Sequence, residues 1–128
     1  DLATFTILRK GINLNHARFY SNPYVTKSIK YINDNIKRKL TIEELCENVH
    51  LSKFYFLRIF KKETGITPYR YILDCKIENI RNDLYNGLDI NTLVSKYEFY
   101  DLSHLNKSFI KIYGITPLEY IKINKNGK

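Results

Sequence analysis

The sequence contains few of the residues that build metal, disulfide or catalytic sites. Its two cysteines, Cys46 and Cys75, lie in no Cys-x-x-Cys or Cys/His ligand spacing, which argues against a zinc site or a disulfide framework. The three histidines, His16, His50 and His104, have no cysteine or carboxylate spaced around them for a metal or general-base site. With five glycines and no Gly-rich phosphate loop, GxSxG or paired-carboxylate motif, we expect no enzyme, no metal and no cofactor.

Methionine and long apolar runs are missing as well. No run approaches the ~20 apolar residues that a membrane span needs, and no basic-then-apolar leader opens the chain. Because translation starts with methionine and position 1 is aspartate, we expect a piece of a longer protein or a processed one. The two cysteines are interpreted as small apolar residues in a reducing cytoplasm, which is the expected location.

The charge is strongly positive. The 128 residues include 21 Lys and Arg against 13 Asp and Glu, a net charge of +8 and a pI near 9.4. A basic surface suits a polyanionic partner, either nucleic acid or an anionic membrane face, and charge alone does not choose between them. Hydrophobic residues make up 44% of the chain, which is enough for the packed core of one domain.

Helical periodicity begins at Pro23. Residues 1–22 lack a sustained pattern and are interpreted as a linker or the end of a preceding region, whereas Val25, Ile29, Ile32 and Ile36 form one amphipathic stripe. Helix starts are marked by a capping box at 41–44 and by Thr67-Pro68, and helix ends by glycines. We predict an all-α fold without a β-sheet core, with helices near 24–38, 42–49, 53–64, 68–86, 90–97, 102–113 and 117–123.

The chain repeats itself after about fifty residues. The apolar residues Ile42, Leu45, Cys46 and Val49 recur 48 positions later as Ile90, Leu93, Val94 and Tyr97. Gly65-Ile-Thr-Pro recurs 49 positions later, at Gly114, so the second copy has one extra residue in its turn. The prediction is two tandem units, about 41–65 and 89–114, joined by a long helix at about 68–86.

Each unit is two short helices joined by a tight turn. The first helix has a full apolar stripe, and the second is apolar on one face and polar or basic on the other. A helix-turn-helix requires this pattern, because one helix packs on the core while its partner offers a polar face to the major groove of DNA. One such unit alone would favour an ordinary small helical bundle, but two copies with matching basic positions favour the DNA-binding interpretation.

From Tyr24 to Lys122 the sequence resembles the AraC family of bacterial transcription regulators. The stretch from Ser52 to Gly65 is similar to the family's first recognition helix, and Phe99 to Phe109, with Gly114-Ile-Thr-Pro117 and Tyr120, to its C-terminal signature. At four positions the chain differs from the residue that is usual in the family: Glu98 stands in place of Gly, Ile110 of Lys, Lys76 of Arg and Ile80 of Ala. These departures affect the second turn and the phosphate contacts expected there, not the fold.

The resemblance implies an architecture for residues 23–128. It is a seven-helix domain with two homeodomain-like helix-turn-helix subdomains bridged by a linker helix. Nineteen helical residues span ~28 Å, comparable to the ~34 Å of one DNA turn, so two recognition helices could enter successive major grooves. The effector or dimerisation function usually lies in a separate N-terminal domain in this family, so dimerisation through a domain outside this chain is an open expectation.

The same match assigns candidate DNA-binding residues on the outward faces of the two recognition helices. Base contacts are expected from Lys53, Phe54, Leu57, Arg58, Leu102, Ser103, Asn106 and Lys107. Arg58 could pair with guanine and Asn106 with adenine, while Phe54 and Leu57 could contact thymine methyl groups. Phosphate contacts are expected from Lys61, Lys62 and Lys111. The alternatives are core packing for Phe54 and Leu57 and a solvated face for the lysines. Tyr71 and Tyr120 are predicted core aromatics.

The leading functional hypothesis is sequence-specific binding of double-stranded DNA that activates transcription through contacts with RNA polymerase. The alternative is a basic helical protein-interaction module whose charged face meets an acidic partner or a membrane. A third hypothesis is non-specific nucleic-acid binding. A membrane-surface protein would be expected to carry a strongly hydrophobic, basic-flanked amphipathic helix, and none stands apart from the core pattern.

Overall fold

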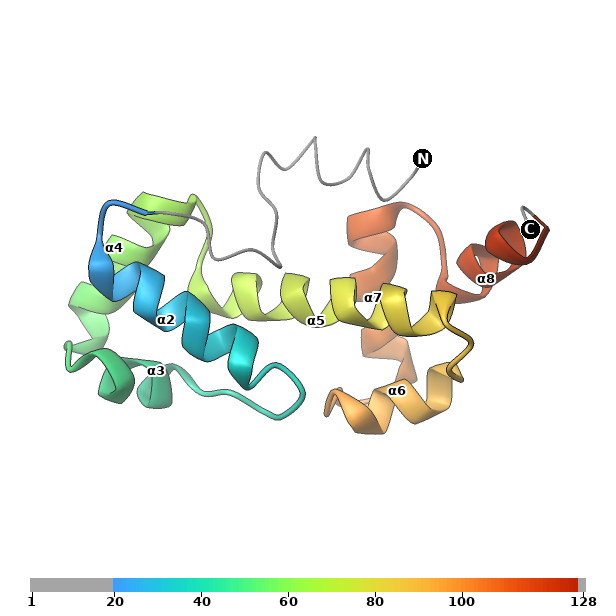
Figure 1. Cartoon of the computed structure of the whole chain (residues 1–128), viewed down its shortest axis with the longest axis horizontal. Helices are drawn as coiled ribbons and strands as arrows, with labels where there is room; N and C mark the ends of the chain where they lie inside the picture. Colours follow the sequence, from blue (N-terminus) through green and yellow to red (C-terminus); the bar gives the residue numbers. More distant parts are fainter. Residues whose placement is uncertain (1–19, 127–128) are drawn as a thin grey trace. The chain divides into compact units, whose positions relative to one another are not determined.

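The structure, a computed structural model, describes residues 20–126, and this part of the chain contains seven helices and no strand (Figure 1). The all-α prediction is therefore confirmed. Residues 1–19 of the expected linker 1–22, His16 among them, lie outside the described residues. The helices are α2 (Pro23–Asp34), α3 (Ile42–Val49), α4 (Lys53–Thr64), α5 (Pro68–Tyr85), α6 (Ile90–Lys96), α7 (Leu102–Tyr113) and α8 (Pro117–Asn126).

Two predicted helix ends are wrong by three or four residues: α8 runs to Asn126 rather than to 123, and α2 stops at Asp34 rather than at 38. Asn35 leaves the helical conformation, with φ −122° and ψ 22°, while its N–H still bonds to the carbonyls of Tyr31 and Ile32. Arg38 then turns back and donates to the hydroxyl of Tyr31 at 3.1 Å. Ile36 is still buried, so the apolar stripe continues through the turn after the helix has ended.

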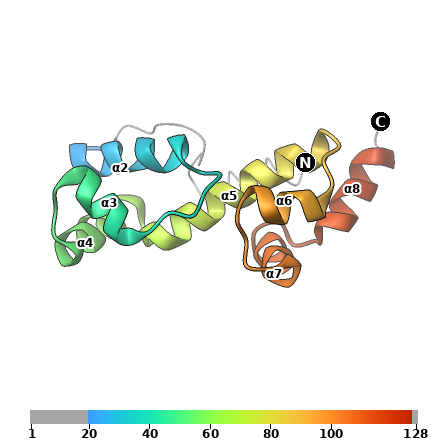
Figure 2. The same cartoon turned by 90° about the horizontal axis from the view of Figure 1, so that it is seen from below.

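The chain divides into two compact units, and the first runs from residue 20 to 75. In this unit α2, α3 and α4 pack against one another (Figures 1 and 2). Asn22 precedes α2 and caps it with its side chain, and its N–H donates to the Glu63 carboxylate at 3.0 Å. Aromatic packing joins α4 to the start of α5, and the buried core residues include Val25, Ile29, Ile32, Leu45, Val49, Phe56, Phe60 and Tyr71. Both cysteines are buried.

In the second unit, residues 76–126, α7 packs against both α6 and α8 (Figure 2). Tyr120 of α8 lies edge-on to Phe109 of α7, with ring centroids 5.9 Å apart, as Tyr71 lies against Phe60 at 5.6 Å in the first unit. The prediction of Tyr71 and Tyr120 as core aromatics is confirmed, because both are buried. The tandem repeat of the sequence is thus a repeat of tertiary contacts.

Three residues of the repeated apolar pattern are less buried than that pattern suggested. Ile42, in the first turn of α3, and Ile90 and Val94, in α6, are half-buried, as is Leu73 in α5. In the middle of α5 the polar residues Asp74, Lys76 and Glu78 are buried instead. The simple amphipathic pattern therefore does not describe this helix, because polar as well as apolar side chains of its central turns are removed from water.

The capping box predicted for α3 is present, and it anchors a polar network. The Thr41 hydroxyl accepts from the N–H of Glu44 at 3.1 Å, and the Glu44 carboxylate also accepts from Arg38 and, at 2.7 Å, from the Tyr31 hydroxyl. The hydrogen bond from Arg38, and then that from Tyr31, lower the pKa of the Glu44 carboxyl from 4.5 to about 2. The network joins the loop after α2 to the start of α3.

A depressed pKa makes this network sensitive to acid. The Glu44 carboxylate stabilises the folded state above its unfolded pKa of 4.5, and this stability is lost as the pH falls toward about 2. We expect Glu44→Gln to lower the free energy of unfolding by about 1 kcal/mol at pH 7, since the ion pair is partly exposed to solvent. Urea titrations at pH 7 and near pH 2 should show the difference between variant and wild type shrinking at the lower pH.

Glu47 provides the matched control, because it is exposed on the same helix. Glu47→Gln should change stability little at either pH. If Glu44→Gln lowers the free energy of unfolding by the same amount at both pH values, the effect does not come from the ionised carboxylate.

Among the residues that the structure describes, no helix is both long and apolar enough to cross a membrane.

Candidate nucleic-acid interface

The first helix-turn-helix is built by a left-handed residue between two capped helices. His50 ends α3 with φ +58°, and the N–H of the next residue, Leu51, bonds to the carbonyl of Cys46 at 3.1 Å. Ser52 follows at once and caps α4, its hydroxyl accepting from the N–H of Tyr55 at 3.3 Å. The chain therefore turns within three residues, which brings the start of α4 close to the end of α3.

The second turn uses the same device at the position where the resemblance led us to expect glycine. Glu98 has φ +53°, a conformation that costs a non-glycine residue about 1 kcal/mol. The preceding carbonyl, that of Tyr97, accepts from the buried Lys76 ammonium at 2.8 Å. Burial lowers the pKa of Lys76, and the nearby Glu98 carboxylate opposes this shift. The linker helix thus supports the left-handed turn directly.

Helix α4 separates an apolar face from a basic one. Phe56, Ile59 and Phe60 are buried in the core. Every residue predicted on its outward face is on the solvent side: Leu57 is half-buried, and exposed are Lys53, Phe54, Arg58, Lys61 and Lys62. The Phe54 side chain is 76% exposed, so its interpretation as a core residue is wrong. An aromatic side chain left in water on a basic face is available for a partner.

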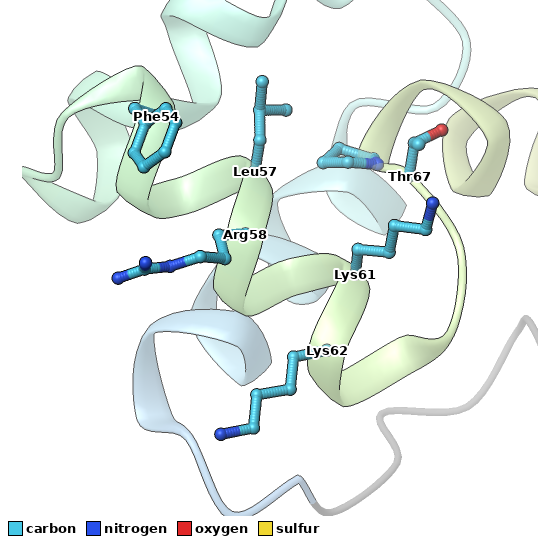
Figure 3. A pocket seen from close by; sticks show the side chains of 7 residues that line it. Phe54, Leu57, Arg58, Lys61, Lys62 and Thr67 are labelled. Carbon is cyan, nitrogen blue, oxygen red and sulfur yellow. The ribbon is translucent and has the colours of Figure 1, made fainter.

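The outward face of α4 borders a hollow of about 530 Å³ that reaches the start of α5. Its lining combines apolar and cationic side chains: Phe54, Leu57, Arg58, Lys61, Lys62, Thr67 and Pro68. Figure 3 shows Lys61 extending toward Thr67, with Lys62 pointing to the other side of the helix. Thr67 and Pro68 were not among the predicted site residues, because their sequence signature is that of a helix start.

Arg58 is held by two aromatic rings. Its guanidinium lies 5.6 Å from the ring centroid of Phe54 and 5.8 Å from that of Tyr55, on the same helix. Such contacts favour a few orientations of a side chain that is otherwise free to rotate. Arg58 is therefore partly preorganised on the solvent face, in a position from which its planar donors point away from the core.

Helix α7 has the same division, with a weaker basic face. Its buried side is formed by Leu105, Ser108, Phe109, Ile112 and Tyr113. Of its predicted site residues, Asn106 is half-buried, and exposed are Leu102, Ser103, Lys107 and Lys111. Ile110 is exposed as well, at a position where the family that the sequence resembles usually has lysine. The second recognition helix thus presents fewer charges than α4.

Histidines and acidic groups build no second site in residues 20–126. His50 forms the left-handed end of α3, and the ring of His104 packs on Phe99 at a centroid distance of 5.3 Å. No group of three or more His, Cys, Asp or Glu residues in this part of the chain is placed to hold a metal ion. The outward faces of α4 and α7, which carry the predicted DNA-binding residues, are the candidate site.

Comparisons with known proteins agree with this geometry. A family model described as a helix-turn-helix domain matches residues 45–123. The multiple antibiotic resistance protein MarA of Escherichia coli (strain K12) is 30% identical over 101 residues, which are 78% of this chain and 80% of MarA. The XylDLEGF operon transcriptional activator 2 of Pseudomonas putida is 28% identical over 108 residues, covering 81% of this chain and 69% of the activator.

A solved structure has the same fold. The DNA-binding domain of AdpA, described as a global transcriptional factor in complex with a target DNA, superposes with a TM-score of 0.77 at 15% sequence identity. The superposition covers 84% of this chain and 97% of that domain. The chain spans only 33% to 39% of the length of three other curated relatives, which are therefore much longer proteins.

Proposed function

The chain belongs to the AraC family of DNA-binding, helix-turn-helix transcription regulators, and we propose that it reads a specific double-stranded DNA sequence with α4 and α7. The observation that carries the proposal is the division of both helices into a buried apolar face and a solvent face on which all the candidate residues lie. A protein-interaction module would not need this division twice, with a basic residue at matching positions, Arg58 and Lys107.

The roles of the residues follow from their chemistry. Arg58 presents a planar pair of donors that matches the O6 and N7 acceptors of guanine, and Asn106 can pair with the N6 and N7 atoms of adenine. Phe54 and Leu57 offer apolar surface to thymine methyl groups. The remaining base-reading candidates are the apolar Leu102 and the polar Lys53, Ser103 and Lys107. Lys61, Lys62 and Lys111 neutralise phosphates.

The regulatory outcome that we propose is activation of transcription through contacts with RNA polymerase in the cytoplasm. It is supported by the relative from Pseudomonas putida that is named a transcriptional activator. Residues 23–128 would act as the DNA-binding domain, with residues 1–22 as a linker or the end of a preceding region. Dimerisation would depend on a domain outside this chain.

Selection from a random pool of DNA duplexes tests the proposal. The chain should enrich one sequence and bind it more tightly than random DNA and than anionic lipid vesicles at the same salt concentration. In footprinting of the selected duplex, two segments of DNA about one helical turn apart should be protected, as expected from recognition helices in successive major grooves. Equal affinity for selected and random DNA would leave non-specific binding, and a preference for vesicles would support the alternative module.

The phosphate contacts are tested by salt dependence. Each phosphate neutralised by a lysine releases counterions, so Lys61→Ala and Lys62→Ala should weaken binding about equally on all DNA sequences. Each variant should also lower the slope of log affinity against log salt by ~1 for every phosphate that is no longer neutralised. Binding titrations over a series of salt concentrations measure both quantities.

Lys30 is the matched control, because it is an exposed lysine, paired with Asp34, on α2 rather than on a recognition helix. Lys30→Ala should leave the salt slope unchanged. If the Lys61 and Lys62 variants behave as Lys30→Ala does, these two side chains are only solvated.

A further inference from the structure

The two helix-turn-helix units match residue by residue until one position in the second turn. His50 and Glu98 are both left-handed, with φ +58° and +53°. The residue after each donates its N–H five residues back, Leu51 to the carbonyl of Cys46 and Phe99 to that of Val94. In the first unit Leu51 is followed directly by Ser52, the N-cap of α4. In the second unit one residue separates Phe99 from Asp101, the N-cap of α7. The inserted residue is therefore Tyr100.

The backbone on both sides of Tyr100 is anchored. Phe99 is buried and packs on the ring of His104. The carboxylate of Asp101 accepts from the backbone N–H of His104 at 2.7 Å. The inserted residue thus has a defined place at the beginning of α7, in front of the helix end that enters the groove in a helix-turn-helix protein.

The side chain of Tyr100 packs on almost nothing. It is 90% exposed, more than any other large hydrophobic side chain in residues 20–126. A one-residue insertion in a turn needs only a small or polar residue, and a phenol ring in water adds little to the stability of the fold. The ring is therefore available for contact with a partner at the start of α7.

We propose that Tyr100 is a further DNA-binding residue, whose hydroxyl donates a hydrogen bond to a phosphate beside the groove that α7 enters; this inference rests on the proposed function. Because Tyr100 precedes the helix, it lies at the wall of the groove rather than over its floor. Phosphate oxygens are acceptors, and tyrosine hydroxyls are among the groups that contact them. The adjacent Asp101 carboxylate is already bonded to the N–H of His104, and a neutral donor brings no second charge beside it.

The test compares Tyr100→Ala and Tyr100→Phe with wild type. Both variants should bind selected and random DNA about 3- to 10-fold more weakly, the value of one neutral hydrogen bond. The salt slope should stay unchanged because no cation is removed, whereas Lys111→Ala should lower it by ~1. Tyr24→Ala, which removes an exposed tyrosine from α2, should bind as wild type does. Thermal unfolding of each variant checks that the fold is retained.

Three results would overturn the inference. Wild-type affinity of Tyr100→Ala would rule out any contact with DNA, and wild-type affinity of Tyr100→Phe would rule out the role of the hydroxyl. A changed preference among single-base variants would make Tyr100 a base-reading residue instead. If wild type shows no preference for any sequence, the proposed function fails. The affinity of the two Tyr100 variants for random DNA still decides whether Tyr100 contacts the DNA backbone.

Discussion

Phe60→Ala should lower the free energy of unfolding by about 3–5 kcal/mol, the cost of removing a large aromatic side chain from a packed core. Phe60 is completely buried. Its ring lies 5.7 Å from Phe56 on the same helix and 5.6 Å from Tyr71 at the start of α5, in an edge-on arrangement with the latter. Alanine therefore removes both ring contacts and leaves a cavity between α4 and α5. Urea unfolding monitored by circular dichroism measures the change.

Phe54→Ala is the matched control, because Phe54 belongs to the same helix and projects into solvent. Its effect on unfolding should stay within about 0.5 kcal/mol. A decrease of less than about 1 kcal/mol for Phe60→Ala would mean that the packing of α4 on α5 does not hold the first unit together.

The two recognition helices could be predicted from the sequence to the residue. Both are bounded by local signals, an N-cap side chain at Ser52 or Asp101 and a left-handed glycine at Gly65 or Gly114. Capping depends on groups within a few residues of the helix end, so a sequence pattern is sufficient to locate it. The repeat extended the same prediction to the paired core aromatics.

The end of α2 could not be predicted in this way. The residues after Asp34 continue the apolar stripe, since Ile36 is buried, but Arg38 bonds to Tyr31 and Glu44 outside the helix. These hydrogen bonds join α2, the loop that follows it and α3. A tertiary network of this kind overrides the local helical pattern.

The outward faces of α4 and α7 were predictable, because a helical period assigns a face to every residue once the buried stripe is known. The contacts on those faces were not. The position of Arg58 over Phe54 and Tyr55 depends on side-chain rotamers. The identity of Tyr100 as the inserted residue depends on matching left-handed residues and backbone hydrogen bonds in the two turns, which the alignment of apolar residues leaves open.

Arg58→Ala should reduce affinity for the selected site by about 1–3 kcal/mol and relax the preference at one base pair. Arg58 lies two positions from each of the buried residues Phe56 and Phe60, so at ~100° per residue it is turned about 200° from each and faces outward. Contact with Phe54 and Tyr55 limits its rotation before DNA arrives. An arginine oriented in this way gives up little rotational freedom on pairing with guanine.

Arg58→Lys separates base reading from charge. Lysine keeps the positive charge but lacks the planar pair of donors. Arg58→Lys should therefore bind random DNA as tightly as wild type does, while its preference at that base pair stays relaxed. Binding of wild type and both variants to a panel of single-base changes in the selected site measures these differences. A uniform decrease in affinity across the panel, with the ranking of sequences unchanged, would make Arg58 a phosphate-binding residue. If wild type itself binds every member of the panel equally, neither α4 nor α7 reads a sequence.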